Sequence, residues 1–142
     1  MSAELANLQR IGKLKAEPPN ARELAGLLES GQRRLADASR EDLAYDSRFD
    51  LAYNAAHALA LHALRREGYR SDNRYLVFQV LPHTLGIAAA QWRVLARAHV
   101  HRNQAEYEGH LEHDHQLLAD LLAAAGSLLA DIRKLPTQGT PP

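Results

Sequence analysis

The stretch SRFDLAYNAAHALALHALRREGYR, residues 47–70, decides the fold. Its apolar residues recur every three or four positions, which is the spacing of a helix with one buried face. Many of them are alanines, so we expect other helices to pack closely against this one. Ser47 is expected to cap the start of the helix, and Gly68 to end it in a left-handed conformation. The stretch therefore predicts a long central helix.

The flanking sequence repeats the helical spacing in four further segments, residues 5–12, 24–35, 92–107 and 118–132. Pro18 and Pro19 separate the first two segments, and Asn20 is a suitable cap for the second. Gly109 is expected to end or kink the helix that precedes it.

Residues 69–87 contain an apolar run that is short and is followed by Pro82, so we expect a brief helix and a loop there rather than a strand. Long antiparallel helices with short connections form bundles. The sequence predicts an all-α fold, an up-and-down helical bundle of four to five long helices, as a single domain over residues 1–135. A disordered tail is expected over residues 136–142.

The composition of the chain limits the classes of function and of site that it can have. Seventeen basic and seventeen acidic residues among 142 give zero formal net charge, so contact with nucleic acid is expected to be local rather than a property of the whole surface. The absence of cysteine excludes disulfides, iron–sulfur clusters and thiolate zinc sites. No run of about eighteen apolar residues could span a bilayer, and the N-terminus has no apolar signal core, so we expect a cytoplasmic protein.

The segment HRNQAEYEGH, residues 101–110, has two interpretations. On a helix, Arg102 and Glu106 can form an exposed ion pair, while Asn103 and Tyr107 lie side by side on the next strip. This arrangement is common on protein surfaces and contributes little to stability. Alternatively, the same residues form a functional site. The spacing of the residues does not decide between the ion pair and the site.

Two blocks of the sequence resemble the HEPN superfamily. Residues 47–70 resemble its signature helix, in which aromatic and small residues precede a basic end and a glycine. RNQAEYEG resembles its second hallmark, an Arg followed by a polar residue and then, four to six residues on, by a His. The resemblance covers residues 47 to about 110. It implies a short helical bundle, often a homodimer, and either a metal-independent ribonuclease or a partner of a nucleotidyltransferase-like protein in a toxin–antitoxin pair.

Carried over, the family's Arg falls on Arg102 and its polar residue on Asn103. Four residues separate Arg102 from Tyr107, which stands where the family has His. A His with a pKa near 6.5 can take a proton from a 2′-hydroxyl near neutral pH, whereas a Tyr with a pKa near 10 is a poor base. Binding of a phosphate by Arg102 survives this replacement better than cleavage does.

The expected site thus has Arg102, Asn103 and Tyr107 at the catalytic positions. The expected substrate-binding residues are Arg102, Tyr53, His57 and His99. We expect a homodimer through the helices of residues 47–68 and 92–107, with Tyr53, His57 and Asn103 near its twofold axis, that binds RNA or a nucleotide without efficient cleavage. One alternative is a metal-independent endoribonuclease in which His99, His101 or His110 is the base. Another is a bundle that only binds a nucleotidyltransferase-like protein.

Two further clusters have structural and functional interpretations. His110, His113 and Asp114 share a face if they lie on a helix, but the expectation is a solvated polar surface, with no native metal and no cofactor. His57 and His62 are expected to pack in or beside the bundle. The arginines near Gly68 either complement the dipole of a helix end or form a phosphate-facing patch, with Tyr69 and Tyr75 available for base stacking; they are Arg65, Arg66, Arg70 and Arg74.

Overall fold

The computed structural model describes residues 2–136, which form seven helices and one pair of two-residue strands. In chain order these are α1 (Ala3–Arg10), β1 (Lys15–Ala16), α2 (Ala21–Ala38), α3 (Tyr45–Arg66), β2 (Tyr69–Arg70), α4 (Arg74–Gln79), α5 (Leu81–Thr84), α6 (Ala89–Glu108) and α7 (His115–Arg133). The prediction of a mostly helical chain packed as a bundle is confirmed. Of the tail expected over residues 136–142, only Pro136 is among the described residues.

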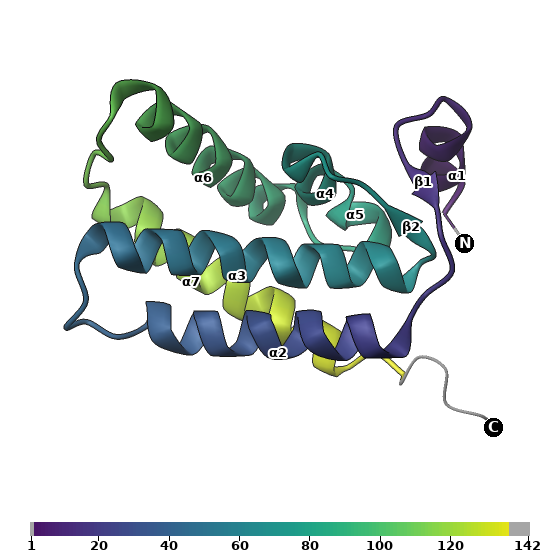
Figure 1. Ribbon diagram of the computed structural model, residues 1–142, viewed down its shortest axis with the longest axis horizontal. Coiled ribbons are helices and arrows are strands. Elements are labelled where there is room, and N and C mark those ends of the chain that lie inside the picture. The colour runs from purple at the N-terminus through teal and green to yellow at the C-terminus, as the bar shows by residue number, and fades with distance from the viewer. Residues whose placement is uncertain (1, 137–142) are drawn as a thin grey trace.

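Helix α3 is the centre of the molecule. Figure 1 shows α2 running beside it in the opposite direction, with α6 on its other side and α7 crossing behind. The side chains of Phe49, Tyr53 and Leu59 are completely or almost completely buried on α3, because α2, α6 and α7 together with the short α4 and α5 surround it. Within the described residues, no helix combines the length and the apolar character needed to cross a membrane.

Side-chain caps and glycines set several helix ends as the sequence predicts. The Asn20 side chain accepts a hydrogen bond of 2.9 Å from the amide of Glu23 at the start of α2. Gly68 follows α3 with φ of +88°, and Gly109 ends α6 with φ of +82°. Side chains other than glycine are strained in this left-handed region. These positions explain why the two long helices stop where they do.

The predicted cap at Ser47 is wrong. Helix α3 begins at Tyr45, after Ala44, whose side chain makes no cap hydrogen bond. Tyr45 is only 6% exposed: its ring lies 6.0 Å from that of Phe49, and its hydroxyl donates to the carbonyl of Asp114 at 3.1 Å. Burial of this aromatic ring extends the helix toward the N-terminus beyond the expected cap.

A pair of short strands holds the N-terminal segment against the bundle. Lys15 pairs with Arg70 and Ala16 with Tyr69 in antiparallel register. The pair is an addition to the expected all-helical fold, and it forms beside Arg65, which is 1% exposed. The Arg65 guanidinium donates to the carbonyls of Glu17, Pro18 and Tyr69 and to the carboxylate of Glu23. Arg65 thus ties α3 to both strands and to α2, which favours the structural interpretation of this residue.

Helices α2 and α3 approach closely at Gly31. A methyl group added at Gly31 would lie 2.6 Å from the Cδ2 atom of Leu59, which is fully buried, whereas one added at Gly26 would meet no atom within 4 Å. We expect Gly31→Val to destabilise the fold by about 1–3 kcal/mol through overpacking. Gly26→Ala should stabilise it by about 0.5–1 kcal/mol through helix propensity. Thermal denaturation checks both, and equal melting temperatures for the two variants would contradict the close contact.

Candidate functional site

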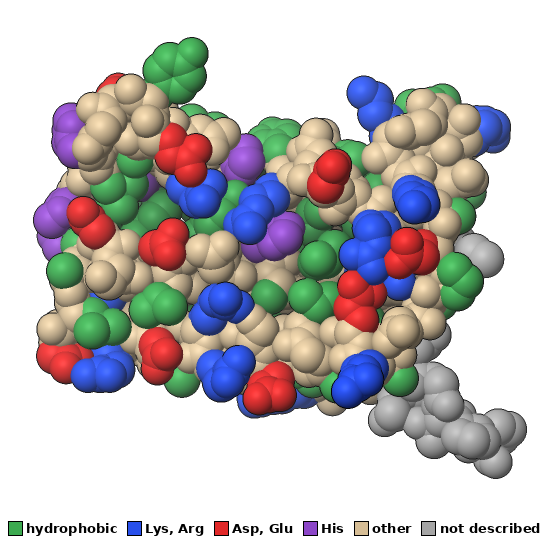
Figure 2. Space-filling model, in the orientation of Figure 1, with side chains coloured by type: hydrophobic (Ala, Val, Ile, Leu, Met, Phe, Trp, Pro, Cys, Tyr) green, Lys and Arg blue, Asp and Glu red, His purple; other side chains and the backbone are tan. Residues whose placement is uncertain are grey.

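A polar cluster surrounds the Tyr53 ring where α3, α4 and α6 meet. Helix α3 places Tyr53 one turn before His57, and α6 places His99 one turn before Asn103, while Arg74 begins α4. Figure 2 shows histidine side chains beside basic ones over this region of the surface. We call the group the Tyr53 cluster; it consists of Tyr53, Asn54, His57, Arg74, His99, Arg102 and Asn103.

A hydrogen-bonded chain runs through the cluster. The Tyr53 hydroxyl lies 3.0 Å from Nδ1 of His99, and the Asn103 amide nitrogen lies 3.1 Å from Nε2 of the same ring. An amide nitrogen can only donate, so Nε2 of His99 accepts, and in the neutral ring Nδ1 carries the proton and donates to Tyr53. With the Asn103 amide in this orientation, both ring nitrogens of His99 have a hydrogen-bond partner. Displacement of the Asn103 amide would leave the Nε2 lone pair free to accept a proton or a ligand hydrogen bond.

Two arginines lie over the same tyrosine ring. The guanidinium carbons of Arg102 and Arg74 are 4.9 and 5.6 Å from the centroid of the Tyr53 ring. Arg74 donates to Asn54 at 3.0 Å and has no acidic partner among the described residues. Arg102 pairs with Glu106 at 3.2 Å, and the Glu106 side chain is 64% exposed. Because water screens an exposed pair of this kind, the two guanidiniums leave the cluster locally positive.

The pKa values of the two histidines reflect this charge. Burial lowers the pKa of His57 to about 4, and the positive charges of Arg74 and Arg102 act in the same direction. Burial also lowers the pKa of His99, again with Arg102 and Arg74 contributing. Both rings are therefore neutral at pH 7. A neutral imidazole beside two cations is an arrangement in which an anion is attracted and a hydrogen-bond acceptor or base is available.

The low pKa of His57 predicts acid sensitivity. In the unfolded chain this ring has a pKa of 6.5, so between pH 6.5 and about 4 the unfolded state binds more protons than the folded state. Stability is fully present above this window and falls as the pH decreases through it. We expect about 2 kcal/mol to be lost through His57 between pH 7 and pH 5.

The measurement is denaturant unfolding at both pH values for the wild type and for His57→Gln. The variant should lose less stability than the wild type by about that amount. An identical pH dependence of the two proteins would show that His57 titrates normally in the folded state.

A hollow between Arg102 and the acidic residues of α3 is unsuited to binding an anion. It has a volume of about 410 Å³ and lies between the start of α3 and the end of α6. Its wall carries the carboxylates of Asp46, Asp50 and Glu106 as well as Arg102. These carboxylates repel a phosphate at close range. An anion would meet less repulsion on the α4 side of Arg102, toward Arg74.

The expected site residues are only partly brought together. Arg102, Asn103, His99 and His57 join Tyr53 in one cluster. The side chain of Tyr107 is 97% exposed, so within the chain it stands in solvent rather than in the cluster. Tyr53 is 0% exposed and so cannot itself meet a partner subunit or a ligand. Its hydroxyl instead contacts His99, and its ring lies beneath Arg74 and Arg102.

The histidines near the start of α7 do not share a helical face. His110, His113 and Asp114 lie in the connection between α6 and α7, so the spacing expected for a helix is absent. Asp114 caps α7 by accepting from the amide of Leu117 at 2.9 Å, and His113 pairs with Asp46 at 3.1 Å. Among residues 2–136, no group of three or more His, Asp or Glu side chains is placed to hold a metal ion.

Arg74 does not lie with the arginines among which the sequence places it, namely Arg65, Arg66 and Arg70. Of these, Arg70 donates to the carboxylates of Glu17 and Glu23. Only Arg74 turns toward the Tyr53 cluster, because the α4 helix starts after Asn73, whose side chain caps it at the amide of Leu76. That cap was the one signal in the sequence that Arg74 begins a new helix.

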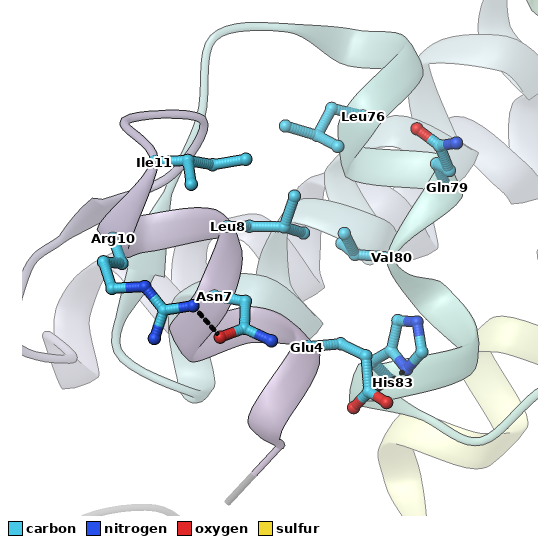
Figure 3. A pocket seen from close by; sticks show the side chains of 9 residues that line it. All are labelled: Glu4, Asn7, Leu8, Arg10, Ile11, Leu76, Gln79, Val80 and His83. Carbon is cyan, nitrogen blue, oxygen red and sulfur yellow. Dashed lines mark hydrogen bonds and ion pairs between the residues drawn. The ribbon is translucent and has the colours of Figure 1, made fainter.

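A second hollow, of about 480 Å³, lies between α1 and the α4–α5 segment (Figure 3). Leu8, Ile11 and Leu76 point toward one another across it. At its edge Arg10 is held by the side chain of Asn7 at 2.6 Å, and Glu4 lies 3.8 Å from His83. The apolar side chains that cross it and the carboxylate of Glu4 at its rim do not favour an anion.

Comparisons of the chain with models of protein families, with curated proteins and with solved structures found no match. The Tyr53 cluster is therefore interpreted from its own geometry and charge.

Proposed function

We propose that this chain is a HEPN-like bundle that binds RNA or a nucleotide through phosphate at the Tyr53 cluster. The observation that carries the proposal is the placement of Arg74 and Arg102 over one aromatic ring beside two neutral histidines. Arginine donates paired hydrogen bonds to phosphate oxygens and stays charged at all relevant pH values. Asn103, which is exposed, adds an amide donor at the same surface.

The overall charge of zero agrees with a local site of this kind. A protein that held long nucleic acid by charge alone would carry a broad basic surface. Here the cations that matter belong to two helices, α4 and α6, and both reach the same side of α3. Recognition of one or two phosphates fits this arrangement.

Binding of a short single-stranded RNA over a range of salt concentrations tests the proposal. Each phosphate contact contributes a slope of about −0.7 to the dependence of log affinity on log salt. Arg74→Ala should therefore weaken binding and reduce the magnitude of the slope by about one contact. Arg33→Ala, on the exposed face of α2, is the control and should leave both quantities unchanged. Absence of RNA and nucleotide binding by the wild type would refute the proposal.

A homodimer forms part of the proposal, and the surface of α6, rather than the buried face of α3, would meet the partner subunit. Helix α6 leaves Tyr107 97% exposed, and a partner subunit would cover such a side chain. A symmetric interface there would bring a second Tyr53 cluster close to the first. Sedimentation at micromolar concentration is expected to show a dimer, and a monomer throughout that range would remove this part of the proposal.

RNA cleavage without metal is the second candidate function, and the hydrogen-bonded chain of His99 favours it. Nε2 of His99 could take the 2′-hydroxyl proton once a ligand displaces the Asn103 amide, while Arg102 stabilises the charge that develops on the phosphate. Because Tyr107 replaces the family's His and stands in solvent, we expect little or no cleavage in the presence of chelator. Cleavage by the wild type that His99→Gln abolishes would establish the second candidate instead.

A further inference from the structure

Aromatic side chains continue from the Tyr53 cluster along α4 and α6. The His99 ring lies 6.2 Å from that of Tyr53 and 5.6 Å from that of Tyr75. The Tyr75 ring in turn lies 6.1 Å from that of Trp92, nearly at right angles to it. Arg74 and Tyr75 are neighbours in the sequence. The Arg74 guanidinium lies in the Tyr53 cluster, and the Tyr75 ring lies next to it against the surface of α6.

This aromatic group is accessible to a ligand. Tyr75 is 37% exposed, whereas Phe49, Tyr53 and Phe78 are buried. A hollow of about 370 Å³ begins at Tyr75 and is lined along α6 by Ala96, Arg97, Val100 and Gln104, among others. Its lining combines an aromatic ring, apolar carbon, a cation and an amide with the ring of His101 and the carboxylate of Asp114, which also caps α7. A flat heterocycle with polar edges suits these contacts.

We propose that Tyr75, supported by Trp92, forms a base-stacking subsite beside the phosphate site, so that the ligand is a single-stranded RNA or a nucleotide rather than a bare phosphate or a duplex. This inference rests on the proposed function, because the phosphate held by Arg74 and Arg102 brings the base to Tyr75. In a duplex both faces of each base are already stacked, so a duplex cannot offer a base to this ring. Stacking accepts every base, so little sequence preference is expected.

Trp92 provides a direct measurement because it is the chain's single tryptophan. Titration with a short oligouridylate should quench its fluorescence, since a base stacked on Tyr75 lies close to the indole. An abasic oligomer of equal length, which carries the same phosphates, should bind about fivefold or more weakly and cause no quenching. An RNA duplex of the same length should also cause none.

Two variants separate stacking from packing. Tyr75→Phe keeps the ring and should bind the oligouridylate as the wild type does. Tyr75→Leu keeps apolar contact with Trp92 but removes the ring, and should lower the affinity for the oligouridylate to that for the abasic oligomer. Circular dichroism verifies that both variants are folded. The wild-type titrations test the subsite even if a variant does not fold.

The outcomes distinguish the two proposals. If the oligouridylate and the abasic oligomer bind equally well without quenching, the stacking subsite is wrong and phosphate binding stands. If neither binds, the proposed function fails and the subsite fails with it. Quenching with a preference for the oligouridylate that Tyr75→Leu removes is the result that we expect.

Discussion

Replacement of Arg65 by Met is expected to lower the free energy of unfolding by about 3 kcal/mol, the largest stability effect that we predict for a single side chain. Arg65 is 1% exposed and donates to three backbone carbonyls and to Glu23. Its removal leaves those carbonyls without donors. The carboxylates of Glu17 and Glu23 are about one-third exposed, so water can compensate them in part. The expected loss therefore lies at the lower end of the range for broken buried pairs.

Urea denaturation measures this loss, and Arg66→Met is the matched control. Arg66 is the next residue of α3, is only partly buried, and makes one hydrogen bond, to the carbonyl of Pro136. Its replacement is expected to change the free energy of unfolding by less than about 1 kcal/mol. If both variants lose the same stability, Arg65 is not the residue that joins the strand pair to the bundle.

Arg102→Ala is expected to weaken binding of a short RNA by roughly tenfold to hundredfold. A charge-assisted hydrogen bond contributes about 1.5–3 kcal/mol, which corresponds to that range. Arg33→Ala is a close control, because Arg33 and Glu29 on α2 have the same i,i+4 arrangement as Arg102 and Glu106. Only the pair on α6 lies against Tyr53. The control variant should bind RNA as the wild type does.

The partner of Arg102 predicts a change of opposite sign. Glu106→Gln removes a negative charge at 3.2 Å from the guanidinium and so should strengthen RNA binding, by a few-fold at low salt. If Arg102→Ala leaves the affinity unchanged, phosphate is bound elsewhere. If Glu106→Gln weakens binding, then Glu106 positions Arg102 and does not compete with the ligand.

Much of the helical framework could be predicted because local chemistry determines it. Asn20 caps α2 through its own side chain, and Gly68 and Gly109 occupy left-handed positions that follow the long helices. Contacts between distant segments overrode local signals elsewhere. Because the Tyr45 ring is buried, α3 starts before Ser47. The guanidinium of Arg65 donates hydrogen bonds to carbonyls more than forty residues away in the sequence. Neither effect has a signature in the nearby sequence.

The site was predictable to a similar extent. The spacing of α6 indicates that His99 and Asn103 are neighbours, and the family resemblance adds Arg102. Their contact with Tyr53 within one chain is not predicted, because the sequence places Tyr53 near a twofold axis instead. The sequence places Arg74 with Arg65, Arg66 and Arg70 instead, because only the packing of the short α4 helix directs it to the cluster. The resemblance of RNQAEYEG to the family's motif places Tyr107 at a catalytic position. Its 97% exposure depends on how far α6 extends beyond the bundle.

Binding of phosphate at the Tyr53 cluster is tested most directly by nuclear magnetic resonance of the histidine rings during titration with a short single-stranded RNA. His57 and His99 lie beside the two arginines, whereas His62 and His83 lie in other parts of the bundle. We expect the ring signals of His57 and His99 to shift in proportion to saturation, and those of His62 and His83 to remain unchanged. RNA binding that leaves the signals of His57 and His99 unchanged would contradict the assignment of this cluster as the site.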